Sequence, residues 1–283
     1  MQLEIHKKTT YNLIEQTRIE TAGGEFYQGQ DLELGRTVAV KCVRIEGGSR
    51  AEREANYQKA MAEVRTMVLL RQEDLNIPLI YQTHYDEEKQ MLYIIMEWIN
   101  GNTLAQCMQY PEKQFLRWMI DLCGILERME RRRVYHKDVK PANVMINNSQ
   151  KLYLIDFNIS LSTSNQVEGT PNYRAPEMFG LVKYVGRDKV DMFAVGVMLY
   201  EYYAGAVPVF PTDYAKNRRW GPDKWDKFIE PREKNPNIPQ IVNDAVVQCM
   251  RMDPRQRYRW IGELKQDLIK AVREIDGKRK NHT

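Results

Sequence analysis

Two hydrophobic periods run along this chain, and they predict different structures for its two parts. From Thr10 to Tyr27 and from Thr37 to Val43 the residues are β-type, and the polar residues 31–36 between them are typical of a hairpin turn. Residues 51–72 change to a helical spacing. A buried strand is predicted at residues 92–96. The first part of the chain is therefore expected to be β-rich with one helix.

Helical spacing dominates the second part of the chain. Residues 112–133 form an amphipathic pattern in which apolar side chains recur every three or four positions. The most apolar stretch is Met192 to Phe210, but Glu201 interrupts it, so it predicts a buried helix and its exit loop, and not a membrane span. A short hairpin and two further helices are predicted at residues 144–155, 241–252 and 261–275.

Composition narrows the class of protein without naming a function. The chain has 283 residues, of which 43% are hydrophobic and 28% charged, as in a soluble globular protein of one large domain or two lobes. A net charge of +4 is too mild to indicate nucleic-acid binding. Its 4 cysteines form no CxxC pair and no apolar leader is present at the N-terminus, so a reducing, cytoplasmic location is expected.

One polar stretch carries the candidate chemistry. Between Asp138 and Asp156 the chain places two carboxylates, Lys140 and the carboxamide of Asn143. Phosphoryl transfer from a metal-bound nucleotide needs such a set. One carboxylate accepts the proton of the attacking hydroxyl, the other joins the carboxamide in holding metal ions, and the lysine offsets phosphate charge.

The stretch resembles the catalytic core of protein kinases, whose pattern is H-R-D-x-x-x-x-N followed by D-F-G. Here the chain reads His136-Lys137-Asp138, four residues, Asn143, and then Asp156-Phe157-Asn158. The segment from Gly169 to Glu177 resembles the GTxxYxAPE pattern of the same family, and Val38 to Lys41 resembles its VAIK strand. The resemblance runs from Thr10 to Ile275 with its motifs in order.

The resemblance implies an α+β, two-lobed fold. Residues 1–97 would form a small β-rich lobe with one regulatory helix, residues 98–275 a larger helical lobe, and residues 276–283 a basic tail. It also implies a eukaryotic-type serine/threonine kinase that binds ATP in the cleft between the lobes and uses Mg²⁺, or Mn²⁺ in its place. Protein substrates, including the chain itself, are the implied partners; the oligomeric state stays open.

Roles follow residue by residue from the resemblance. Asp138 would orient the substrate hydroxyl and accept its proton, Lys140 would neutralise the γ-phosphate, and Asn143 and Asp156 would bind the metal. Lys41 would contact the α- and β-phosphates, held by an ion pair with Glu63. The nucleotide itself would be bound by Lys41, Asn143 and Asp156 together with Gly24, Ala39, Glu97, Ile99 and Met145.

Supporting residues are implied in the same way. Thr170 would bridge Asp138 and Lys140, Glu177 would pair with Arg257, and Asp191 would anchor the backbone of the catalytic loop. Two departures from the family pattern concern regulation. Lys137 stands where an arginine often clamps a phosphorylated loop, and Asn158 replaces a glycine at a turn that needs positive φ. The implied phosphorylation sites are Ser160, Ser162, Thr163, Ser164 and Thr170.

The glycine-rich loop departs most from the family. Its pattern G-x-G-x-x-G brings backbone N–H groups close to phosphates, but here Ile19 and Thr21 replace the first two glycines and only Gly24 remains. Phe26 follows at the position that would cover adenine.

Because the glycine-rich loop is altered, the alternative to an active kinase is a scaffold of the same fold that binds partners with little catalysis. A small-molecule kinase is a third hypothesis, against which the segment ending at Glu177 argues, because it supports a platform for protein substrates.

Overall fold

The computed structural model describes residues 2–5, 9–21, 24–157, 170–179, 186, 188–208 and 229–280. Its contacts divide the chain into two compact units. The β-rich unit comprises Met1–Gly101 and takes in Ile155, Asp156 and Phe157. The helical unit comprises Asn102–Leu154 and the described residues from Thr170 onward. The division by contacts thus falls at Gly101, slightly later than the boundary expected at residue 97, and it assigns Asp156 to the β-rich unit.

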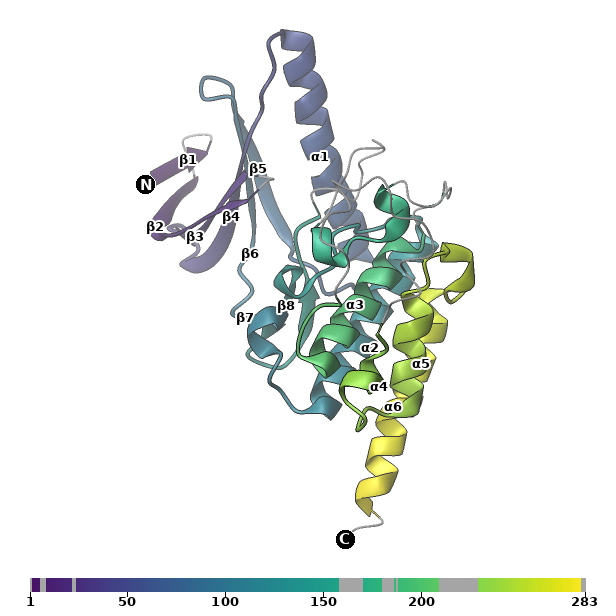
Figure 1. The fold of residues 1–283 in the computed structure, drawn as a ribbon. Coiled ribbons are helices and arrows are strands. Elements are labelled where there is room, and N and C mark those ends of the chain that lie inside the picture. The colour runs from purple at the N-terminus through teal and green to yellow at the C-terminus, as the bar shows by residue number, and fades with distance from the viewer. Residues whose placement is uncertain are drawn as a thin grey trace. The chain divides into compact units, whose positions relative to one another are not determined.

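The β-rich unit is built on a curled antiparallel sheet of six strands in the order β1-β2-β3-β4-β6-β5 (Figure 1). The strands are listed here in chain order: β1 Gln2–Ile5, β2 Thr9–Thr21, β3 Gly24–Asp31, β4 Arg36–Arg44, β5 Ile80–Asp86 and β6 Met91–Glu97. The sequence indicated β2, β3, β4 and β6. It gave no signal for β1, which is four residues long, or for β5, whose residues are all half-buried and show no clean alternation.

Alternation along β4 gives the sheet its two faces. Val38, Val40 and Cys42 point into a hydrophobic core that also holds Leu3 of β1 and Tyr11 of β2. Residues between them point to the other face, because successive side chains of a strand alternate. Lys41 is therefore placed on the face opposite this core.

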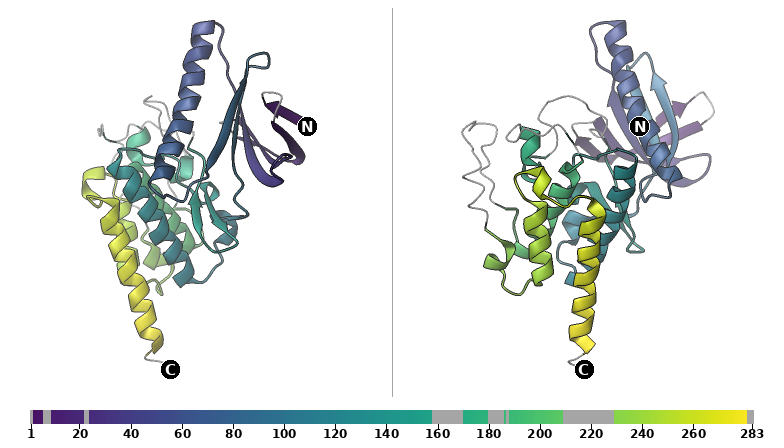
Figure 2. Two further views of the ribbon diagram at one scale, coloured as in Figure 1. Left: turned by 180° about the vertical axis from the view of Figure 1, so that it is seen from behind. Right: turned by 90° about the vertical axis from the view of Figure 1, so that its right-hand side faces the viewer.

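One long helix, α1 (Arg50–Gln72), belongs to the β-rich unit and lies beside the sheet (Figures 1 and 2). Ser49 begins it with a capping box: the Ser49 hydroxyl accepts from the Glu52 N–H, and the Glu52 carboxylate accepts from the Ser49 N–H. The expected helix at residues 51–72 is confirmed. Its buried side chains include Glu63, Val64 and Met67, so Glu63 is a charged residue on the packed face.

The most buried helix of the helical unit is α3 (Val190–Ala204), nearly all of whose residues are buried. The other helices are α2 Glu112–Arg131, α4 Pro231–Lys234, α5 Gln240–Cys249 and α6 Ile261–Lys280. Of these, α2, α4 and α5 contact α3. A small sheet, β7 (Gly101–Thr103), β8 (Val144–Asn147) and β9 (Leu152–Leu154), completes the unit. The helix α6 continues past residue 275, where the sequence placed the end of the lobe. Among the described residues, none of the helices combines the length and the apolar character that a membrane span requires.

Gly196 lies where α3 packs closely against the end of α5, so a substitution at Gly196 tests this packing. A Cβ at Gly196 of α3 would lie 2.7 Å from the Cβ of Cys249 and 2.9 Å from the Cγ of Met250. Gly196→Ala is therefore expected to lower the free energy of unfolding by about 1–3 kcal/mol, measured by urea denaturation. Gly277→Ala is the matched control, since a Cβ at that helical position in α6 meets nothing within 4 Å. An unchanged stability in the Gly196 variant would contradict this close packing.

Candidate active site

The β-rich unit buries a lysine between two carboxylates. The side chain of Lys41 is 1% exposed, and its Nζ lies 2.9 Å from Oε1 of Glu63 and 3.8 Å from Oδ1 of Asp156. Three elements supply the group: β4 carries the lysine, α1 carries Glu63, and the residues after β9 carry Asp156. A buried ammonium is tolerated only when it is paired in this way. The predicted pairing of Lys41 with Glu63 agrees with this distance.

The helical unit holds a second group, centred on the carboxylate of Asp138. Its Oδ1 accepts from the backbone N–H of Thr170 at 2.8 Å and from the Thr170 hydroxyl at 2.9 Å. Its Oδ2 accepts from Nζ of Lys140 at 2.7 Å and from Nδ2 of Asn143 at 3.0 Å. Lys140 also donates to the Thr170 hydroxyl at 2.7 Å, so Thr170 bridges the other two residues. These four donors fix the direction in which the carboxylate points.

Asn143 of the helical unit and Asp156 of the β-rich unit each offer oxygen atoms of the kind that a hard divalent cation prefers. Nδ2 of Asn143 donates to the Asp138 carbonyl at 2.9 Å as well as to the carboxylate, which leaves the amide oxygen as the ligand atom. Asp156 supplies carboxylate oxygens. Mg²⁺ and Mn²⁺ prefer oxygen ligands of these kinds, so the two residue types match the expected metal. Within the described residues, no group of three or more His, Cys, Asp or Glu side chains forms a separate metal cluster.

The backbone of the catalytic loop is held by a buried carboxylate from α3. Asp191 accepts from the N–H of His136 at 2.7 Å and from the N–H of Lys137 at 2.7 Å. Lys137 has a φ of 66°, an uncommon value for a non-glycine residue. Burial raises the pKa of Asp191, and His136 and the two backbone hydrogen bonds oppose that shift. The anchoring role expected of Asp191 is what its geometry provides.

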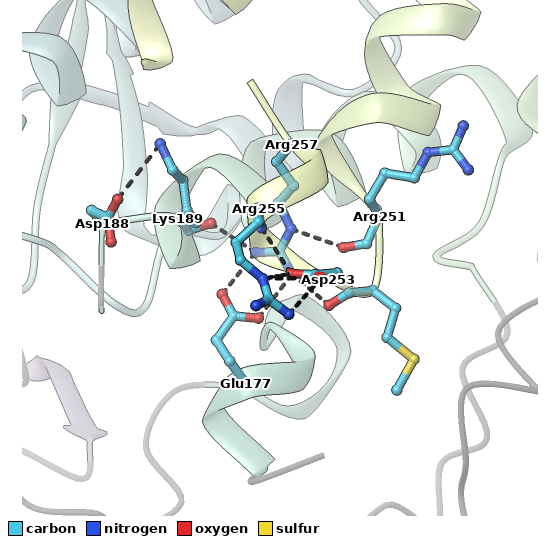
Figure 3. A network of polar contacts seen from close by, with 8 residues as sticks. Glu177, Asp188, Lys189, Arg251, Asp253, Arg255 and Arg257 are labelled. Atoms are coloured by element: carbon cyan, nitrogen blue, oxygen red, sulfur yellow. Dashed lines mark hydrogen bonds and ion pairs between the residues drawn. The ribbon is translucent and has the colours of Figure 1, made fainter. Parts of the chain in front are cut away.

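A buried ion pair joins the segment after Thr170 to the residues that precede α6 (Figure 3). Arg257 donates from Nη1 and Nη2 to the two oxygens of Glu177 at 2.7 and 2.8 Å, and the two side chains are 0% and 2% exposed. Arg257 also donates to the carbonyls of Arg251 and Lys189. The same figure shows a contrasting pair, Arg255 with Asp253, whose arginine is 69% exposed.

These two arginines give a matched pair of variants. Arg257→Gln leaves a buried carboxylate without its partner, and we expect a loss of about 3–5 kcal/mol in the free energy of unfolding. Arg255→Gln breaks an exposed pair and is expected to cost about 1 kcal/mol or less. Urea denaturation followed by circular dichroism measures both. Equal, small losses would show that the Glu177 pair contributes no more than a surface contact.

The expected nucleotide-contacting residues are distributed over both units. Ala39 of β4 is half-buried and pairs across the sheet with Met96 of β6. Glu97 uses its N–H to bond the Leu79 carbonyl at 2.8 Å, and Ile99 is buried two residues later. Met145 is half-buried in β8 of the helical unit. The joint role of these residues in binding the nucleotide stays a prediction.

Gly24 has a packing role that its motif did not suggest. It adopts a φ of +126°, and a Cβ at this position would lie 2.2 Å from the carbonyl oxygen of Cys42. Only glycine allows β3 to approach β4 so closely here. The role of Gly24 in binding phosphate, inferred from its place in the loop, remains untested.

Several expected features lie outside the described residues. These are Asn158, the residues Ser160, Ser162, Thr163 and Ser164, and Gly169.

Sequence reasoning missed one contact beside the catalytic group. The Tyr173 hydroxyl donates to Oε2 of Glu201 at 2.6 Å. Burial, and then this hydrogen bond to a carboxylate, raises the pKa of the Tyr173 phenol. The available signal was a lone glutamate in an otherwise apolar helix, since a charge in a buried helix needs a partner.

Comparison with known proteins decides the family. Residues 20–269 match the protein kinase domain. The chain belongs to this family. The match covers the Lys41 group and the Asp138 group alike, and the fold described above is the two-lobed α+β fold of protein kinases, as the sequence predicted.

Bacterial kinases are among the similar proteins. The chain is 27% identical over 261 residues to the serine/threonine-protein kinase PknB of Mycobacterium leprae. It is 26% identical over 272 residues to PrkC of Bacillus subtilis and 29% identical over 279 residues to PknA of Mycobacterium tuberculosis. These alignments cover 87%, 90% and 91% of the chain. The chain spans only 40% of the length of PknB and of PrkC, and 60% of PknA.

Proposed function

We propose that this chain transfers the γ-phosphoryl group of ATP, in the presence of Mg²⁺, to serine and threonine hydroxyls of proteins, including its own. The observation that carries the proposal is the Asp138 carboxylate, which Thr170, Lys140 and Asn143 orient through four hydrogen bonds. A carboxylate held in this way can aim a hydroxyl and accept its proton.

The other residues supply charge and position. Lys140 lies 2.7 Å from Asp138 and brings positive charge to the site of transfer. Lys41, fixed by Glu63, would bind the α- and β-phosphates, and Asn143 and Asp156 would hold the metal. The bound metal ion neutralises phosphate charge during transfer. We assign the backbone of Glu97 and Ile99, with Ala39 and Met145, to the adenine.

Three observations support the class of substrate and the location. The similar proteins PknB, PrkC and PknA are named serine/threonine-protein kinases. Lys140 lies two residues after Asp138, which is the pattern of the serine/threonine class. The described cysteines Cys42, Cys107, Cys123 and Cys249 are free and buried, as expected in a reducing compartment. We infer that the substrates are cytoplasmic proteins.

The test is transfer from ATP labelled in its γ-phosphate to a general protein substrate. We expect label on phosphoserine and phosphothreonine after acid hydrolysis, and its loss when the divalent cation is chelated. Label on tyrosine alone, or only on a small molecule, would contradict the proposed substrate class.

One observation favours a scaffold as the second candidate. The β2–β3 hairpin is paired up to Thr21 and Gly24, where kinases use a glycine-rich loop. Binding of ATP without transfer to any protein would support the scaffold. The intact Lys41–Glu63 and Asp138–Lys140 pairs favour catalysis instead.

A further inference from the structure

The end of the β2–β3 hairpin is paired strand to strand where kinases use a glycine-rich loop, beyond a register shift between Ile14 and Ile19. Ile19 pairs with Phe26, Glu20 with Glu25, and Thr21 with Gly24. Polar contacts reinforce the ladder, because Nη2 of Arg18 donates to Oε1 of Glu25 at 2.7 Å. The conformation of this segment is therefore set by strand pairing, and the side chains of Ile19 and Phe26 take the fixed directions of a strand.

The ladder places Phe26 directly beside the buried lysine. In the β3–β4 register Phe26 is the partner of Lys41. The ring of Phe26 is half-buried, and the Nζ of Lys41 lies 5.5 Å from its centroid. An ammonium within about 6 Å of an aromatic face is attracted to it, and more strongly when the cation is desolvated. With 1% of its surface exposed, Lys41 meets that condition.

We propose that Phe26 is a positioning residue for Lys41. In this chain a side chain of β3 contributes to the placement of the buried ammonium. The ammonium is held by Glu63 at 2.9 Å, by Asp156 at 3.8 Å and by the Phe26 ring. The ring directs the lysine toward the phosphates before the nucleotide binds. The proposal deepens the proposed function, and only its kinetic part rests on that function.

The first readout needs neither nucleotide nor activity. Ring currents of Phe26 shift the ε-methylene proton resonance of Lys41 upfield in spectra of the whole chain with labelled lysine, and Lys41→Arg identifies the signal. We expect the shift in the wild type and in Phe26→Tyr, and its loss in Phe26→Leu. A wild-type signal at the position of an ordinary lysine, or one that Phe26→Leu leaves unmoved, would overturn the contact.

The second readout separates positioning from packing. Phe26→Leu keeps an apolar side chain but removes the ring, so the KM for ATP is expected to rise about tenfold with kcat little changed. Phe26→Tyr keeps the ring and is expected to stay within about twofold of the wild type. Ile19→Ala is the control, because Ile19 lies opposite Phe26 and is 62% exposed. Equal losses in the leucine and tyrosine variants would show a packing role and overturn the proposal.

Failure of the proposed function gives a different result. If the wild type transfers no phosphate, the affinity for ATP, measured by displacement of a fluorescent ATP analogue, replaces KM in the same comparison. Absence of transfer together with the tenfold loss in Phe26→Leu would refute the kinase activity and retain the role of Phe26. Transfer in the wild type with no effect of Phe26→Leu on KM would retain the kinase activity and refute the role of Phe26.

Discussion

Asp156→Asn is expected to abolish metal-dependent phosphoryl transfer while leaving the fold nearly unchanged. The substitution keeps the shape of the side chain but removes the charge that binds the metal. It also removes a carboxylate 3.8 Å from the Lys41 ammonium. Because electrostatic stabilisation of the transferred group is the main contribution of such a site, we expect kcat to fall by at least about 10²–10³-fold.

The measurement is the initial rate of transfer at several Mg²⁺ concentrations, together with thermal unfolding of each variant. Asp86→Asn is the control in the same unit, since Asp86 pairs with the exposed Lys89 at 3.0 Å, away from the Lys41 group. We expect wild-type rates from the control. Full activity in Asp156→Asn would show that the metal assignment is wrong.

Asp138→Asn is the second variant with a large expected effect. The amide oxygen of Asn can still accept from Thr170, but its NH₂ group would face the donors Lys140 and Asn143, which now bond to Oδ2. Removing a positioned general base typically costs about 10²–10⁴-fold, and we expect kcat to fall by that factor with little change in the KM for ATP. Steady-state kinetics on a protein substrate measures both parameters.

A companion variant tests whether the orientation of the Asp138 carboxylate or its charge contributes more to kcat. Thr170→Val removes the hydroxyl that bonds Asp138 at 2.9 Å and Lys140 at 2.7 Å but keeps the backbone N–H contact. It should reduce kcat less than Asp138→Asn does. A larger loss from the threonine variant would mean that Thr170 does more than orient the carboxylate.

Local patterns predicted much of the fold because its elements have strong periodicity. The strand alternation around Lys41 and the helical spacing around Glu63 predicted the elements that carry these residues, whereas their pairing was foreseeable through the resemblance to the kinase family. The network of Asp138, Lys140 and Thr170 was also foreseeable, but only through the family motif. Asp138 and Thr170 are 32 positions apart, and no local rule relates them.

The features that were missed depend on contacts between strands. The short strand β1 is stabilised by Leu3, which packs into the core, and by pairing with β2. The residues of β1 alone predict neither contact. The glycine loop was expected to be altered, but the pairing of residues 19–21 with residues 24–26 depends on the register of β2 and β3, which shifts between Ile14 and Ile19. The role of Gly24 depends on the position of the Cys42 carbonyl, which only the folded sheet defines.

The most direct test of the account is autophosphorylation with labelled ATP and Mg²⁺, comparing the wild type with Asp138→Asn and mapping the labelled residues. The account predicts label on serine or threonine in the wild type, with sites in the segment from Ser160 to Thr170, and none in the variant. Equal label in both proteins would show that Asp138 is not the catalytic carboxylate. No label in either protein, no transfer to an added protein and retained binding of ATP would contradict the kinase activity itself.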